Sequence, residues 1–91
     1  MSNGIWRLNS RASLREGPNG DEGILLDTYT ADICSCNGTA WTILQIIKKG
    51  AAIKQIVAGV RKEYDVSMKV AERDVLSFVR KLKSMELVDG Q

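Results

Sequence analysis

The chain has 91 residues, of which 44% are hydrophobic and 26% are charged, and its formal net charge is +2. This length accommodates one domain with a single small core, and the hydrophobic content excludes a disordered chain. No apolar run is long enough to span a bilayer, and the N-terminus lacks the apolar core of a signal peptide. We therefore expect a cytoplasmic protein with no membrane partner.

Residues 1–11 form an N-terminal segment without a clear hydrophobic period, and we expect this segment to fray or to pack loosely. The predicted domain covers residues 12–88. It opens with an alternating segment, Ala12 to Glu16, which predicts a first strand. Residues 17–23 are rich in glycine and predict a hairpin loop. They lack the Gly-Lys-Ser/Thr ending of a phosphate-binding loop.

Two further strands are predicted at Ile24–Asp27 and Asp32–Cys36, joined by a short turn. Asn37 follows the third strand, and its side chain is expected to cap the next helix by accepting from free N–H groups. Apolar residues recur from Ala40 to Ile47 and predict a helix that is buried on more than one side.

A second helix is predicted from about Ala52 to Tyr64, and a third from the N-cap Ser67 to about Met85. The predicted fold class is thus α+β and winged-helix-like, with a small three-stranded antiparallel sheet followed by three helices.

The third predicted helix has an asymmetric apolar surface. Its core sector is expected to consist of five residues, namely Ala71, Val75, Phe78, Leu82 and Met85. Leu76 and Val79 continue the apolar surface to one side only, flanked by Glu72 and Lys83. A neighbouring element covers these two residues, or they line an open groove.

No catalytic set is present. The chain has no histidine, its carboxylates show no paired spacing, and its serines and threonines have no candidate base, so we expect no enzyme activity. Cys34 and Cys36 are the only cysteines and point to the same face of a predicted strand. We expect them to be small core residues, with no metal, cofactor or disulfide.

The charge is distributed unevenly. Residues 48–83 carry ten Lys or Arg and four Asp or Glu, which gives +6, while residues 1–47 and the last eight residues each sum to −2. This distribution indicates a solvated basic face, or alternatively a surface for a weakly acidic partner.

The order and spacing of several motifs between Gly23 and Val88 resemble the PqqD family. These are small winged-helix proteins that recognise the leaders of ribosomally made, post-translationally modified peptides (RiPPs). The motifs are Ile-Leu-Leu-Asp at 24–27, Cys-Asn-x-Thr-Ala at 36–40, Glu-Tyr-Asp-Val at 63–66 and Asp-Val-x-x-Phe-Val-x-x-Leu at 74–82, closing on Leu87-Val88. Two positions depart from the family pattern: Cys36 stands where leucine is usual, and Glu86 where glycine is common.

The resemblance implies a RiPP recognition element that binds a precursor leader peptide and delivers it to a partner modifying enzyme. In this family the leader adds as a strand to the last strand of the sheet, beside the last helix. On this chain the implied peptide-binding residues are Asp32, Ile33, Cys34, Ser35, Cys36, Glu72, Val75, Leu76, Val79, Arg80 and Lys83.

Two partner enzymes fit a stand-alone protein of this kind. A leader protease of lasso-peptide biosynthesis, served by a separate B1 protein, is slightly favoured, and the alternative is a PqqD-type peptide chaperone for a radical SAM enzyme. A winged-helix DNA-binding protein would present Arg73, Arg80 and Lys81. However, no wing hairpin is expected after that helix and the basic residues are scattered, so we expect no nucleic-acid partner. An adaptor or oligomer that pairs through an open strand edge is a further alternative.

Overall fold

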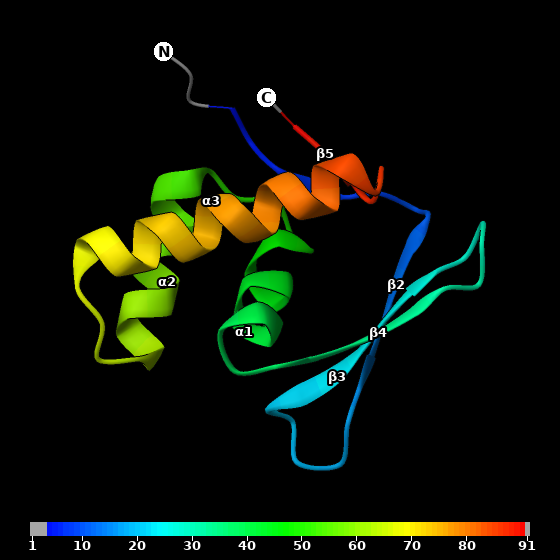
Figure 1. The fold of residues 1–91 in the computed structure, drawn as a ribbon, viewed down its shortest axis with the longest axis horizontal. Helices are drawn as coiled ribbons and strands as arrows, with labels where there is room; N and C mark the ends of the chain where they lie inside the picture. Colours follow the sequence, from blue (N-terminus) through cyan, green and yellow to red (C-terminus); the bar gives the residue numbers. More distant parts are fainter. Residues whose placement is uncertain (1–3, 91) are drawn as a thin grey trace.

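The computed structural model describes residues 4–90 of the chain. Its main sheet has three antiparallel strands, β2 (Ala12–Glu16), β3 (Glu22–Asp27) and β4 (Ile33–Asn37), in the order β2-β3-β4 (Figure 1). This confirms the predicted three-stranded sheet. The structure starts β3 two residues earlier than predicted, and β4 both starts and ends one residue later.

Three helices follow the sheet: α1 (Gly38–Ile47), α2 (Ile53–Glu63) and α3 (Met68–Ser84). The fold is therefore α+β, as the hydrophobic periodicity predicted. Ser67 caps α3 as expected, because its hydroxyl accepts a hydrogen bond from the Val70 N–H at 3.2 Å.

The predicted cap of α1 is only half right. Asn37 occupies the N-cap position, but its side chain makes no capping hydrogen bond. Asn37 is still the last residue of β4, and the change of direction falls on Gly38, whose φ of 55° lies in the left-handed region that glycine adopts readily. The turn into α1 thus depends on the glycine backbone and not on the asparagine side chain.

Helix α1 packs on one face of the sheet, where Gly23 permits a close approach. A Cβ at Gly23 would lie 2.5 Å from the Arg15 carbonyl oxygen and 2.6 Å from Cζ3 of Trp41. Trp41 itself is only 3% exposed. The tryptophan ring therefore lies directly on the β3 backbone, and no larger residue fits between them.

One hydrophobic core joins the sheet to all three helices. Its largest fully buried side chains are Ile43, Leu44, Ile47, Ile56, Leu82, Leu87, Val60, Val75 and Val79. Helix α3 crosses the other two helices, and the sheet extends beyond them (Figure 1). Helix α2 packs against one side of α3, and the other side faces the start of α1, just after β4.

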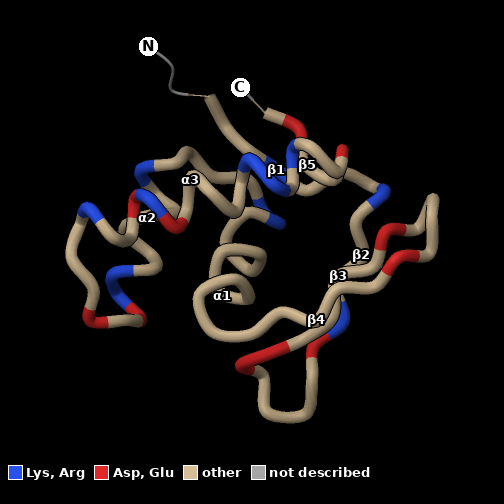
Figure 2. The backbone as a smooth tube through the Cα atoms, in the orientation of Figure 1, with Lys and Arg blue, Asp and Glu red and all other residues tan. Residues whose placement is uncertain are grey.

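The two ends of the described chain meet in a second, two-stranded sheet. Strand β1 (Arg7–Leu8) pairs antiparallel with β5 (Val88–Asp89), and Figure 2 shows the two segments side by side. Trp6 adds a bridge to Ala51, with N–H to O distances of 2.8 and 2.9 Å. Residues 4–9 are therefore held by pairing rather than frayed, while residues 1–3 lie outside the described part.

Between residues 4 and 90, no helix is long and apolar enough to cross a membrane.

Candidate functional site

Strand β4 has an open edge. Its partner on one side is β3, and no strand within residues 4–90 pairs with its other side. The Asp27 N–H donates to the Asp32 carbonyl oxygen at 2.9 Å, in the register of the β3–β4 ladder. Because residues of an antiparallel strand alternately face toward and away from the partner strand, Ile33, Ser35 and Asn37 direct their main-chain groups outward. The edge thus offers donors and acceptors for one more strand.

The side chains of β4 alternate between two environments. Cys36 is 5% exposed and Cys34 is partly buried on the core side of the sheet, whereas Ile33 and Ser35 face solvent. Burial raises the pKa of the Cys36 thiol to about 11, and the charge of Lys81 opposes part of this rise. Cys36 is therefore a neutral, buried thiol at physiological pH, as befits a small core side chain.

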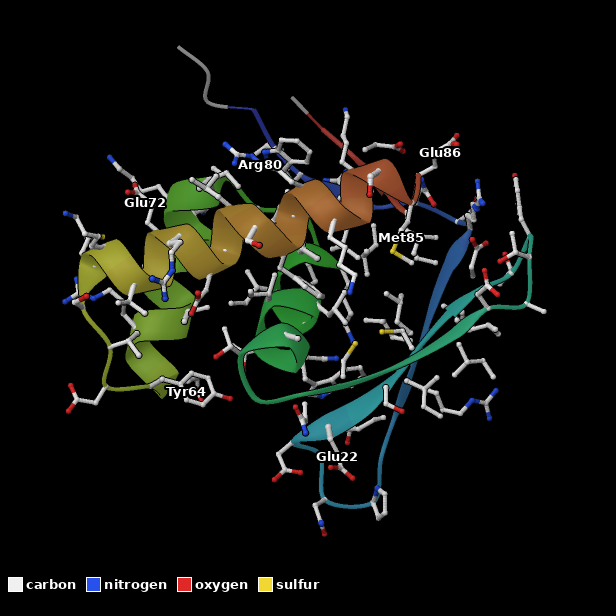
Figure 3. All side chains as sticks on the ribbon, in the orientation of Figure 1. Glu22, Tyr64, Glu72, Arg80, Met85 and Glu86 are labelled. Atoms are coloured by element: carbon white, nitrogen blue, oxygen red, sulfur yellow. The ribbon has the colours of Figure 1, made fainter. Side chains whose placement is uncertain are left out.

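A small groove lies between α3 and the first turns of α1, the helix that directly follows β4, and we call it the β4-side groove. It encloses about 300 Å³ and is lined by Thr39, Ala40, Ile43, Asp74, Ser77, Phe78 and Lys81. Phe78 supplies its largest apolar surface, since the ring is only partly buried against the core. Met85 lies one turn beyond Lys81, on the side of α3 that faces the sheet (Figure 3). The groove combines an apolar wall with one carboxylate and one ammonium group.

A larger groove lies on the opposite side of α3, and we call it the α2–α3 groove. It encloses about 1100 Å³, between α2, α3 and the segment around Trp6. Four of the residues predicted to bind peptide line it, namely Glu72, Leu76, Val79 and Arg80. Figure 3 shows Glu72 and Arg80 on the side of α3 that faces away from the sheet.

The structure therefore divides the predicted peptide-binding residues into separate groups. Residues 32–36 lie at the open edge of the sheet, as expected, but the α3 residues do not lie beside them. Val75 is fully buried in the core, and Lys83 lies over the Trp6 ring at 5.4 Å and donates to the Gly90 carbonyl oxygen at 3.2 Å.

Two expectations about burial on α3 are wrong. Val79 was expected outside the core and is 2% exposed, because α2 packs against that side of α3 and buries it with Val57 and Val60. Phe78 was expected at the centre of the core and is only partly buried, on the shoulder of α3 that lines the β4-side groove. Both alternatives for this side of α3 are thus met in part, because α2 buries Val79 while Leu76 and Val79 also line the α2–α3 groove.

Sequence reasoning missed the α3 residues of the β4-side groove. Asp74, Ser77, Phe78 and Lys81 are related by spacings of three and four residues, which places them on one shoulder of a helix. This spacing identifies the shoulder, and an aromatic residue between two opposite charges could have drawn attention to it. Only the packing of α2 shows which of the two shoulders remains open beside the sheet.

The fold and the open edge agree with the family to which this chain belongs. The family of coenzyme PQQ synthesis protein D (PqqD) matches residues 22–88, and the chain is a member of it. No curated protein matches the chain.

Solved structures share the fold over almost the whole chain. TbiB1 in complex with the TbiA(beta) leader peptide is 24% identical, with a TM-score of 0.81 and coverage of 91% of this chain and 94% of that one. A lasso peptide synthetase B1 complexed with the leader peptide is 27% identical, with a TM-score of 0.77 and coverage of 92% and 96%. The PqqD truncation of Methylobacterium extorquens PqqCD, a stand-alone RiPP recognition element, is 19% identical, with a TM-score of 0.72 and coverage of 93% and 88%.

Proposed function

We propose that this protein recognises the leader region of a ribosomally made precursor peptide and presents it to a modifying enzyme, without catalysing a reaction itself. The observation that carries the proposal is the open edge of β4, together with the β4-side groove that begins just after β4 runs into α1. Membership of the PqqD family and similarity to B1 proteins in complex with leader peptides support it. The leader would add to the sheet as a fourth strand.

The proposed contacts combine main-chain and side-chain recognition. Ile33, Ser35 and Asn37 supply outward N–H and C=O groups, and each hydrogen bond contributes about 0.5–1.5 kcal/mol net. Phe78 would contact an apolar leader side chain, while Asp74 and Lys81 would select polar neighbours. Several such hydrogen bonds and one or two buried leader side chains are sufficient for about micromolar affinity, even after the entropy lost when the peptide becomes ordered is subtracted.

This proposal keeps the predicted β4 residues 32–36 and replaces the predicted α3 residues. Glu72, Leu76, Val79 and Arg80 line a groove on the other side of the helix and are too far round it to border a strand added to β4. The shoulder of Asp74, Ser77, Phe78 and Lys81 takes their place in the proposed site.

The favoured partner enzyme is a lasso-type leader protease, because one similar solved structure is a lasso peptide synthetase B1 at 27% identity. A radical SAM enzyme is the alternative partner, in keeping with the PqqD family match.

A proline at Ser35 tests the strand-addition mode. Proline removes an outward N–H that β3 does not use, so the sheet should persist while the added strand loses a hydrogen bond and meets a bulky ring. We expect Ser35→Pro to weaken leader binding by at least about tenfold, because one hydrogen bond is lost and the proline ring clashes locally. Fluorescence anisotropy with a labelled leader measures the affinity, and circular dichroism checks the fold.

Glu16→Pro is the matched control. Gly17 donates its N–H to the Glu22 carbonyl oxygen at 2.8 Å, so the alternation along β2 turns the main chain of Glu16 toward the other free edge of the sheet. This variant should bind the leader as the wild type does. Equal losses for the two proline variants, or no loss in a folded Ser35→Pro protein, would reject strand addition at β4.

A further inference from the structure

The α2–α3 groove has the length and shape of a helix-binding site. Its α3 wall runs from Met68 to Arg80, about 18 Å at 1.5 Å per residue, and its α2 wall from Ile53 to Arg61, about 12 Å. Both walls follow rows of residues spaced by four, the ridges against which a third helix packs. An elongated trough between two helices fits about three turns of helix better than a compact small molecule.

The floor of this groove is apolar and already ordered. Val57 and Val79 are buried at its base, and Leu76 and Ile53 are partly exposed on its walls. Met68, at one end, is 54% exposed. The Trp6 backbone is fixed by its pairing with Ala51, so the third wall is held in place. Binding of an apolar occupant would therefore carry only a small entropic cost for ordering the site.

The rim of the groove is basic. Its charged residues are Lys54, Arg61 and Arg80, against the single carboxylate of Glu72. Arg61 also donates to the Val66 carbonyl oxygen at 3.3 Å, which holds its side chain at the α2 end of the rim. An occupant with carboxylates along the edges of an apolar stripe complements this pattern.

We infer that the α2–α3 groove docks an acidic amphipathic helix of the modifying enzyme, on the side of α3 opposite the leader. This inference rests on the proposed function, since it assigns a second surface of the same recognition element. The two sites lie on different shoulders of α3, so one protein can hold the leader and the enzyme together. A second copy of this chain is a poor occupant, because residues 48–83, which contain both exposed helices, carry a net charge of +6.

The test uses two synthetic helical peptides of about 14 residues, both with a leucine stripe spaced by three and four. One peptide carries glutamates beside the stripe, and its twin carries lysines at the same positions. Titration into ¹⁵N-labelled protein should shift the amides of α2 and α3 that line the groove with the glutamate peptide only. The double variant Arg61→Glu/Arg80→Glu should lose at least about tenfold in affinity for it and gain affinity for the lysine twin.

Lys62→Glu/Arg73→Glu is the matched control, because these exposed residues lie on the same helices outside the groove. It should bind the glutamate peptide within about twofold of the wild type, since Lys62 and Arg73 do not line the groove and their exposed charges are screened by salt. Equal effects of the two double variants would overturn the inference, as would binding of both peptides alike or shifts confined to β4.

Two further outcomes assign the groove to another occupant and likewise overturn the inference. One is a wild-type dimer in sedimentation that Leu76→Asp abolishes. The other is peptide binding that appears only after residues 1–3 are deleted. Leader affinity measured on the same variants separates the two proposals. If the leader does not bind the wild type, the proposed function is refuted. The amide shifts on α2 and α3 test helix binding in the α2–α3 groove, whatever the leader affinity is.

Discussion

Asp27 is the one buried charged residue among residues 4–90, and it forms an ion pair with Arg11, which lies just before β2. The Arg11 guanidinium donates from Nε to Oδ1 at 2.8 Å and from Nη2 to Oδ2 at 3.0 Å. Tyr29 contributes twice: its N–H donates to the same carboxylate at 2.9 Å, and its ring lies 4.7 Å from the guanidinium. This cluster fixes the β3–β4 turn and thereby the start of the edge strand.

The buried carboxylate makes stability depend on pH. The hydrogen bond from Arg11 lowers the pKa of Asp27 from 3.8 to about 2, although desolvation opposes the shift. As pH falls, the unfolded chain takes up this proton first, so the stabilisation is present above about pH 4 and is lost between pH 4 and 2. We expect Asp27→Asn to lower Tm at neutral pH and to show a smaller further fall from pH 4 to pH 2.

Thermal unfolding followed by circular dichroism at several pH values measures this effect. Asp21→Asn is the control, because Asp21 is an exposed turn residue. Its Tm should fall between pH 4 and pH 2 as much as that of the wild type. If the Tm of Asp27→Asn falls by the same amount over this range, another group is responsible for the loss of stability.

At the scale of an element, α3 separates two surfaces that the sequence alone does not distinguish. Its periodicity shows correctly that Ala71, Val75 and Leu82 face the core, because a helix buries residues spaced by three and four. The same pattern leaves both flanking shoulders equally plausible as a groove. Both shoulders carry a groove, and which of them lies on the sheet side depends on where α2 packs, a tertiary contact with no local sequence pattern.

The two shoulders of α3 give contrasting predictions. Phe78→Ala removes the main apolar wall of the β4-side groove and should weaken leader binding by about 1–2 kcal/mol. Because the ring is only partly buried, the stability cost should fall below the roughly 3–5 kcal/mol of a core Phe→Ala change. Leu76→Ala should leave leader affinity unchanged. Peptide affinity and urea unfolding on the same variants measure both effects.

Leu82→Ala serves as the reference for core loss, since Leu82 is 1% exposed, and should cost about 2–5 kcal/mol. If Leu76→Ala weakens leader binding more than Phe78→Ala does, the leader occupies the α2–α3 groove and our assignment of the shoulders is reversed.

The sequence analysis also failed to predict the shortest elements of the structure, strands β1 and β5. Strands β1 and β5 have two residues each, too few to show an alternation, and their pairing joins positions about eighty residues apart. By contrast, β2 was predicted with its observed bounds, because apolar and polar residues alternate in Ala12–Glu16 and strong turn residues follow it. Local patterns thus placed the main sheet and the helices, whereas the pairing of the chain ends could only come from the structure.

At the scale of the whole molecule, positive charge gathers on α2 and α3, whereas residues 12–37, which form the main sheet and its turns, carry five carboxylates and one cation (Figure 2). Arg73 and Arg80 are exposed and lie outside the β4-side groove, which contains one cation, Lys81, and one carboxylate, Asp74. The proposed leader site is therefore nearly neutral, while the basic surface lies elsewhere on α2 and α3.

This separation predicts how binding responds to salt. Leader affinity, carried by main-chain bonds and an apolar contact, should change by no more than a few-fold between 50 and 200 mM salt, because few counterions are released. A protein that binds DNA through six to ten phosphates loses about 10³–10⁵ in affinity over the same range. Titrations with labelled leader and with a random DNA duplex of equal length compare the two ligands directly. Steep salt dependence on duplex DNA, together with no binding of the leader at either salt concentration, would assign the basic helices to nucleic acid and reject peptide recognition.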